Sequence, residues 1–132
     1  MDAQQYVDRI AEARGSVPEF HLVMAKHDFP VLTATDDLTK TAVLSRRSLD
    51  PRTKELLFVV ALVALRGDPA DTAMHIRAAQ RAGASATDVL EALEMLIPLG
   101  GVIPFKEGLR VWCEATGSTG LEASPAPVTT AP

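Results

Sequence analysis

Three residues near the middle of the chain carry side chains that together could move protons. Glu55 comes directly before ten consecutive apolar residues, Leu56 to Leu65, and Asp71 lies four residues before His75. An imidazole titrates near neutral pH, and a carboxylate beside it in apolar surroundings fixes its tautomer and stabilises its charged form. General acid–base catalysis is therefore the chemistry that these residue types and spacings suggest.

Each of these residues also has a purely structural interpretation, which the residues alone leave open. Glu55 suits the first turns of a helix, where the helix dipole favours an acid. Asp71 follows Asp68 at the spacing of a capping box. His75 could be a buried neutral histidine.

Metal and substrate ligands can be considered from the same residues. Two carboxylates and one imidazole suit iron or manganese, but no second histidine lies at ligand spacing, so no metal site is expected. Arg52, near the same helix start as Glu55, is a candidate for binding an anionic substrate, although charges at helix starts usually bind nothing specific.

Two helices are predicted to position the acid and the imidazole. Asp50 is a good N-cap and Pro51 suits the first helical position, so one helix should run from there to about Leu65. Because it is apolar on every side after Glu55, it should be buried all round, either by its own domain or by another subunit. Its apolar run would span only about 15 Å, half of a bilayer core, so it is read as a core helix.

A tight corner should then turn the chain back as an antiparallel helix hairpin. Gly67 can end the first helix in a left-handed conformation, while Asp68 caps the second helix and Pro69 opens it. In that second helix His75 shares a face with Asp71 and with small residues that permit close packing: Ala78, Ala79 and Ala82.

The rest of the chain also indicates helices, so the fold class is expected to be all-α. Helices are predicted at residues 3–14 and 103–115. Three more are expected to begin at a capping box of Ser16 and Glu19, at Asp28 and Pro30, and at a capping box of Ser85 and Asp88. In the helix that begins at Asp28 and Pro30, the side chains of Val31, Leu38 and Ala42 are expected to face inward. Residues 1–116 are predicted to form a single domain, and residues 117–132, rich in Pro, Ser, Thr and Ala, a flexible tail.

Composition excludes some classes of partner and location. With 132 residues and a net charge of -4, the chain has no basic stretch, and nucleic acid is not an expected partner. The first ten residues do not resemble a secretory signal, and one cysteine cannot build a disulfide framework, so a cytoplasmic location without membrane contact is expected. His21, His27 and Cys113 are interpreted as structural.

The motif LDPRTKEL at residues 49–56, together with AMHIRAA at residues 73–79 and the later Gly83, resembles the carboxymuconolactone decarboxylase family. The resemblance covers roughly residues 28–112 and is closer to the decarboxylase branch than to the alkylhydroperoxidases of the same fold. Those peroxidases carry a Cys-x-x-Cys pair, whose positions are occupied here by Asp68 and Asp71. Without a dithiol, disulfide-forming peroxide chemistry is not expected.

The resemblance implies a fold, a site and an assembly. The fold is an alkylhydroperoxidase D-like bundle of about six or seven helices around a central antiparallel hairpin. Glu55 and His75 match the family's glutamate and histidine, and Asp71 stands where decarboxylase relatives often carry a glutamate that is one methylene longer. Relatives form trimers or hexamers with the site near subunit contacts, so a homotrimer or homohexamer is expected.

The function implied is a cofactor-free lyase similar to gamma-carboxymuconolactone decarboxylase, acting on a small anionic substrate. This substrate would be a carboxylated lactone or a related enolisable acid, with His75, Glu55 and Asp71 as catalytic residues and Arg52 binding the substrate. Two alternatives stay open: an alkylhydroperoxidase-like antioxidant protein that depends on Cys113, and a non-catalytic oligomeric binding protein of the same fold.

Overall fold

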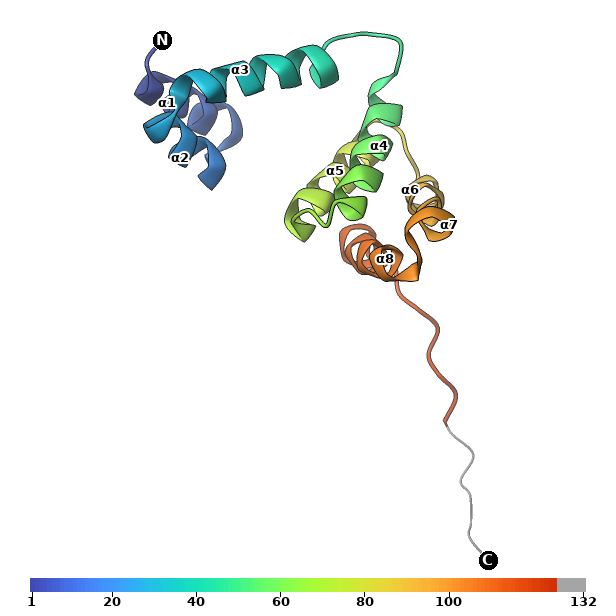
Figure 1. The fold of residues 1–132 in the computed structure, drawn as a ribbon. Coiled ribbons are helices and arrows are strands. Elements are labelled where there is room, and N and C mark those ends of the chain that lie inside the picture. Colours follow the sequence, from blue (N-terminus) through green and yellow to red (C-terminus); the bar gives the residue numbers. More distant parts are fainter. Residues whose placement is uncertain (126–132) are drawn as a thin grey trace, which may run out of the picture. The chain divides into compact units, whose positions relative to one another are not determined.

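The computed structural model describes residues 1–125, and every regular element in that part of the chain is a helix (Figure 1). The prediction of an all-α fold is confirmed. The chain divides into two compact units, one of residues 1–47 and one that begins at Ser48. The expected single domain over residues 1–116 stays a prediction.

The first unit contains α1 (Ala3–Arg14), α2 (Glu19–His27), α3 (Phe29–Thr39) and a π-helical segment, η1 (Lys40–Leu44). The bounds of α1 agree with the prediction because strong local signals set them. Asp2 forms a capping box at its start, and Gly15 ends it with a left-handed φ of 75°. A small core of Tyr6, Ala25 and Leu32 holds the unit together.

Two predictions for the first unit are wrong. No side chain caps α2, which begins after Pro18, so the expected box of Ser16 and Glu19 does not form. In α3, Leu32 is the buried residue, while Val31 and Leu38 are 50% and 67% exposed. The helix is therefore rotated relative to the predicted inward face.

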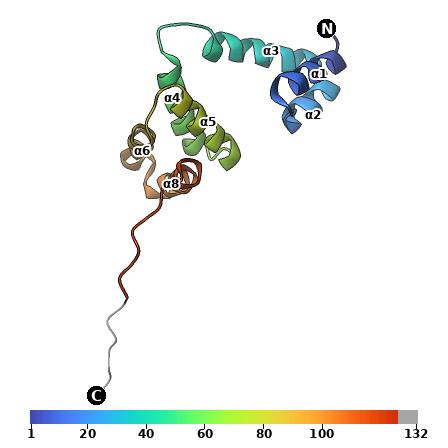
Figure 2. The ribbon, with the colours of Figure 1, turned by 180° about the vertical axis from the view of Figure 1, so that it is seen from behind.

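The second unit contains α4 (Pro51–Ala64), α5 (Pro69–Arg81), α6 (Ala86–Glu94), the short α7 (Ile97–Gly100) and α8 (Val102–Thr116). The predicted hairpin is α4 with α5, which lie side by side in both views (Figures 1 and 2). Helix α8 packs against α5 and α6. The largest fully buried apolar side chains of the core come from α4, α5 and α6: Val59, Ile76, Val89 and Leu93.

Capping residues set the helix starts of the second unit as the sequence predicts. Asp50 accepts a hydrogen bond from the backbone N–H of Thr53, and Asp68 accepts one from that of Ala70. Ser85 and Asp88 form the predicted capping box at the start of α6. These local bonds fix where each helix begins.

The corner between α4 and α5 differs from the prediction in one detail. Arg66, and not Gly67, has the left-handed conformation, with φ of 55°. Gly67 is favoured for a different reason: a Cβ there would lie 2.9 Å from Leu62 Cδ2 and 3.3 Å from the Leu62 carbonyl oxygen. The glycine thus permits a close approach of the chain to α4.

The expectation that α4 is buried all round, by its own domain or by another subunit, stays a prediction. Val59 and Val63 are buried in the core, but Leu57 is 54% exposed. Among residues 1–125, one face of this apolar helix therefore has no covering element of its own unit. On the other face Gly108 of α8 allows close packing, since a Cβ there would lie 3.0 Å from Val63 Cγ1.

The C-terminal segment was expected to be a flexible tail from residue 117. Residues 118–125 have no regular secondary structure, and residues 126–132 lie outside the described part of the chain. Within the described residues, no helix combines the length and apolar character that a membrane crossing requires.

Candidate active site

The hairpin brings Glu55 and His75 into direct contact. Glu55 lies in the second turn of α4 and His75 lies midway along α5. The distance between Glu55 Oε2 and His75 Nδ1 is 2.6 Å, and the two side chains are 20% and 21% exposed. A short contact between a carboxylate and an imidazole nitrogen orients the ring.

A third residue of the site, Phe58, was missed in the sequence analysis. Its ring stacks on the imidazole of His75, with the ring centroids 4.6 Å apart and the planes 4° from parallel. Phe58 lies one turn after Glu55 on α4, so both contact His75 from the same face of the helix. That spacing is the signal that could have identified it. The imidazole is thus held at its edge by a carboxylate and on its face by an aromatic ring.

Asp71 is placed one turn before His75 on α5, but it is exposed and forms no hydrogen bond or ion pair with Glu55 or His75. The predicted capping box with Asp68 is also not formed, since Asp68 accepts its bond from Ala70. The structure therefore does not join Asp71 to the contacting pair, and its catalytic role stays a prediction.

Arg52, the candidate substrate-binding residue, is held by an acid from another helix. Its guanidinium donates a 2.7 Å hydrogen bond to Asp88 at the start of α6. This bond, aided by the backbone N–H of Ser85, holds the pKa of Asp88 below its usual range. Arg52 therefore links α4 to α6, and any substrate-facing role would have to share the guanidinium with Asp88.

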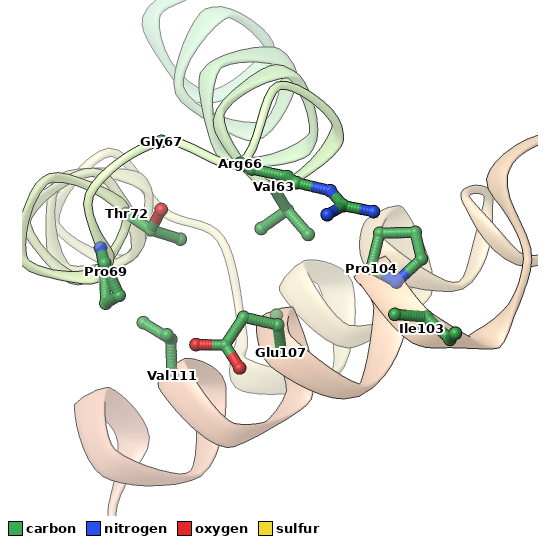
Figure 3. A pocket seen from close by; sticks show the side chains of 10 residues that line it. Val63, Arg66, Gly67, Pro69, Thr72, Ile103, Pro104, Glu107 and Val111 are labelled. Carbon is green, nitrogen blue, oxygen red and sulfur yellow. The ribbon is translucent and has the colours of Figure 1, made fainter.

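A separate hollow of about 360 Å³ lies at the corner end of the hairpin (Figure 3). Arg66 extends across it toward Pro104, and Glu107 rises into it from α8. Neither Glu55 nor His75 lines this hollow. Val63, which does line it, is eight residues beyond Glu55, so the hollow lies about 12 Å further along α4. The hollow and the Glu55–His75 contact therefore lie in different parts of the hairpin.

The sequence predicts structural roles for three further residues: His21, His27 and Cys113. His21 lies 3.8 Å from Asp36 in the first unit, a partner that its sequence neighbours did not indicate. His27 is exposed at the last position of α2, where a basic residue suits the helix dipole. Cys113 is a partly buried free thiol of α8. No cluster of three or more His, Cys, Asp and Glu side chains suited to a metal occurs among residues 1–125.

Comparisons with known proteins agree with this fold. The model of the carboxymuconolactone decarboxylase family matches residues 30–114, well over half of the chain. A crystal structure of a candidate carboxymuconolactone decarboxylase from Burkholderia xenovorans LB400 is similar with a TM-score of 0.67 at 21% sequence identity, covering 86% of this chain and 90% of the other. No curated protein matches the sequence.

Proposed function

The chain belongs to the carboxymuconolactone decarboxylase family, and from this premise we propose that it is a cofactor-free lyase similar to gamma-carboxymuconolactone decarboxylase. Its substrate is a small carboxylated lactone or a related enolisable acid. The observation that carries the proposal is the 2.6 Å contact between Glu55 and His75, because it provides an oriented proton donor. The same contact argues against a binding protein that has lost the chemistry.

The reaction requires an electron sink and a proton. When the bond to the carboxylate carbon breaks, carbon dioxide leaves and the electron pair moves into the conjugated lactone carbonyl, which gives a dienolate. A proton then adds to carbon, and the carbonyl reforms. The substrate is its own electron sink, so the protein has to stabilise the developing oxyanion and deliver one proton.

His75 is the proposed proton donor. With Nδ1 bound to Glu55, the nitrogen that remains for proton delivery is Nε2. Glu55 acts through the imidazole: it fixes the tautomer and stabilises the charged ring before the proton leaves. Phe58 restricts the ring plane, so that Nε2 keeps one direction during turnover.

Arg52 and Asp71 are proposed in supporting roles. The guanidinium of Arg52 has five N–H donors, so it can hold Asp88 and still donate to a substrate carboxylate. Asp71 lies on the same helix as His75 and, as an exposed acid, can act only on a substrate that extends along α5. Replacement of Asp71 by asparagine and of Arg52 by glutamine separates these roles from that of His75.

We also propose that the active form is a homotrimer or homohexamer. Leu57 on α4 and Met74 on α5 neighbour the acid and the imidazole in sequence and are 54% and 48% exposed. A second copy of the chain that packs on these side chains would bury exposed apolar surface of the hairpin. Sedimentation velocity would measure the assembly, and Leu57→Glu should dissociate it. A monomeric wild-type protein with full activity would contradict this proposal.

The direct test of the activity is a screen of carboxylated lactones, followed by loss of ultraviolet absorbance as carbon dioxide is released. His75→Ala should reduce turnover by about 10²- to 10⁴-fold, the usual contribution of a general acid. Arg77→Ala, an exposed change on the same helix, is the control. Turnover that is unchanged in His75→Ala would refute the assignment of the proton donor.

A further inference from the structure

A second polar pocket, which the proposed reaction does not use, lies within the first unit. It encloses about 350 Å³. This is a size suited to a small molecule. One wall is a single face of α1, whose residues recur at intervals of three and four: Tyr6, Arg9, Ile10, Ala13 and Arg14. The polar side chains opposite come from α2, α3 and η1: His21, Asp36, Thr39 and Lys40.

Basic side chains outnumber acidic ones in the lining of this pocket, and both of its arginines are exposed. Arg9 and Arg14 form no ion pair within residues 1–125, and the ion pair of Lys40 is to Asp37, outside the pocket. Arg14, in the last turn of α1, suits the helix dipole, but Arg9 in the middle of the helix has no such explanation. In a protein with a net charge of -4, the pocket is thus locally positive.

The acid in the pocket is already engaged. Asp36, the single carboxylate among the described lining residues, accepts a hydrogen bond from the Tyr6 hydroxyl and lies 3.8 Å from His21 Nε2. Burial and this bond raise the pKa of Tyr6, so its hydroxyl keeps the proton that it donates. Asp36 therefore forms no ion pair with either arginine among residues 1–125, although its negative charge still opposes a bound anion.

Two more features distinguish this pocket from an ordinary surface depression. His21 Nδ1 is buried with no hydrogen-bond partner among residues 1–125, a condition that native proteins rarely leave unexplained. The segment Lys40–Leu44, which contributes its two end residues to the lining, is π-helical, and short π-helical segments occur frequently at functional sites. Both features lie on elements that face α1 across the pocket.

We propose that this pocket binds a small dianionic ligand whose oxyanion groups are held by Arg9 and Arg14. Guanidinium groups pair with carboxylate or phosphoryl oxygens through parallel N–H bonds, and two of them match two negative charges. The apolar side chains of Ile10 and Leu44 provide a wall for a short carbon skeleton. This site is independent of the Glu55–His75 pair and of the reaction proposed there.

Titration of the full-length ¹⁵N-labelled protein with succinate, and separately with inorganic phosphate, tests the proposal at constant ionic strength. The amide resonances of Tyr6, His21 and Asp36 should shift and saturate with a dissociation constant of about 1 mM or tighter. Saturation by succinate alone identifies a dicarboxylate site, and saturation by phosphate alone a phosphoryl site. Saturation by both supports a site for either oxyanion, and saturation by neither overturns the proposal.

Charge variants distinguish binding by these particular side chains from attraction of an anion by the overall charge of the protein. Arg9→Gln and Arg14→Gln should each weaken binding about tenfold, the effect of losing one charged hydrogen-bond donor. Asp36→Asn should strengthen binding, because it removes the opposing charge and keeps an acceptor for Tyr6. Arg77→Gln on α5 is the matched control and should leave binding unchanged.

Because the arginine variants should weaken binding and the Asp36 variant should strengthen it, the binding measurements distinguish the proposal from its alternatives. An equal loss in Arg77→Gln would mean that only overall charge matters, and weaker binding in Asp36→Asn would mean that the variants act through folding of the unit. Either result contradicts the proposal. Far-UV circular dichroism of each variant verifies that the helices of the first unit are retained.

Discussion

Replacement of Glu55 by glutamine tests how the acid supports the imidazole. Glutamine keeps the shape of the side chain and an oxygen that can accept the hydrogen bond from His75 Nδ1, but it removes the negative charge. A hydrogen bond to a charged group contributes about 1.5–3 kcal/mol and a neutral one about 0.5–1.5 kcal/mol. The variant should therefore lose about 1–1.5 kcal/mol of stabilisation of the charged ring, which corresponds to roughly tenfold.

Screening by water should reduce the interaction between the Glu55 carboxylate and the imidazole only slightly. The reason is that the side chains of Glu55 and His75 are 20% and 21% exposed. The expected turnover number of Glu55→Gln is about one tenth of the wild-type value. His75→Ala should lose about 10²- to 10⁴-fold. Since Glu55 acts through the imidazole, the double variant should be no slower than His75→Ala alone.

The assay is the absorbance of a carboxylated lactone under saturating conditions, with Glu91→Gln on the exposed face of α6 as the matched control. A wild-type rate in Glu55→Gln would show that the carboxylate has no part in the reaction. Losses that multiply in the double variant would show that Glu55 acts on the substrate directly. Either result would refute the positioning role derived from the 2.6 Å contact.

Three further changes probe neighbouring features. Phe58→Leu keeps an apolar side chain but removes the stacked ring. Turnover should then fall about fivefold, as expected for an aromatic pair of about 1 kcal/mol, and unchanged turnover would contradict the orienting role. Gly108→Ala places a Cβ 3.0 Å from Val63 Cγ1. It should lower the free energy of unfolding by about 1–3 kcal/mol in urea titrations, and a more stable variant would show that Val63 can move aside. Asp88→Asn should melt below the wild type at pH 6, and the difference should vanish as pH falls through and below the lowered pKa of Asp88, because Arg52 stabilises only the ionised acid. A difference that stays constant while acid protonates Asp88 in the folded protein would refute this cause.

The sequence predicted the features that local chemistry determines. The starts of α4, α5 and α6 were identified from caps and prolines that satisfy backbone N–H groups within a few residues, and the structure contains those bonds. The contact of Glu55 with His75 also follows from local rules, because a short corner fixes the register of the two antiparallel helices. The roles of these residues in catalysis stay predictions.

The features that the sequence did not reveal depend on packing between elements. The inward face of α3 was predicted from Val31, but Tyr6 and Ala25 of other helices select Leu32. The stack of Phe58 on His75 was not predicted because Phe58 lies in a uniformly apolar run, where only its place one turn after Glu55 sets it apart. Asp36 could not be recognised as the neighbour of His21, since fifteen residues and a helix connection separate them. The periodicity of apolar residues indicates which face of a helix is buried, but it does not indicate which residues of other elements pack against that face.

The acid and the imidazole both come from one hairpin, and residues 65–68 alone connect its two helices. One inserted residue within either helix would turn everything beyond it by about 100°, which would swing Glu55 or His75 out of reach. Additions to the C-terminal segment after Thr116 leave that pairing intact. The architecture thus confines tolerated length changes to segments outside the hairpin, where they leave the geometry of the Glu55–His75 contact unchanged.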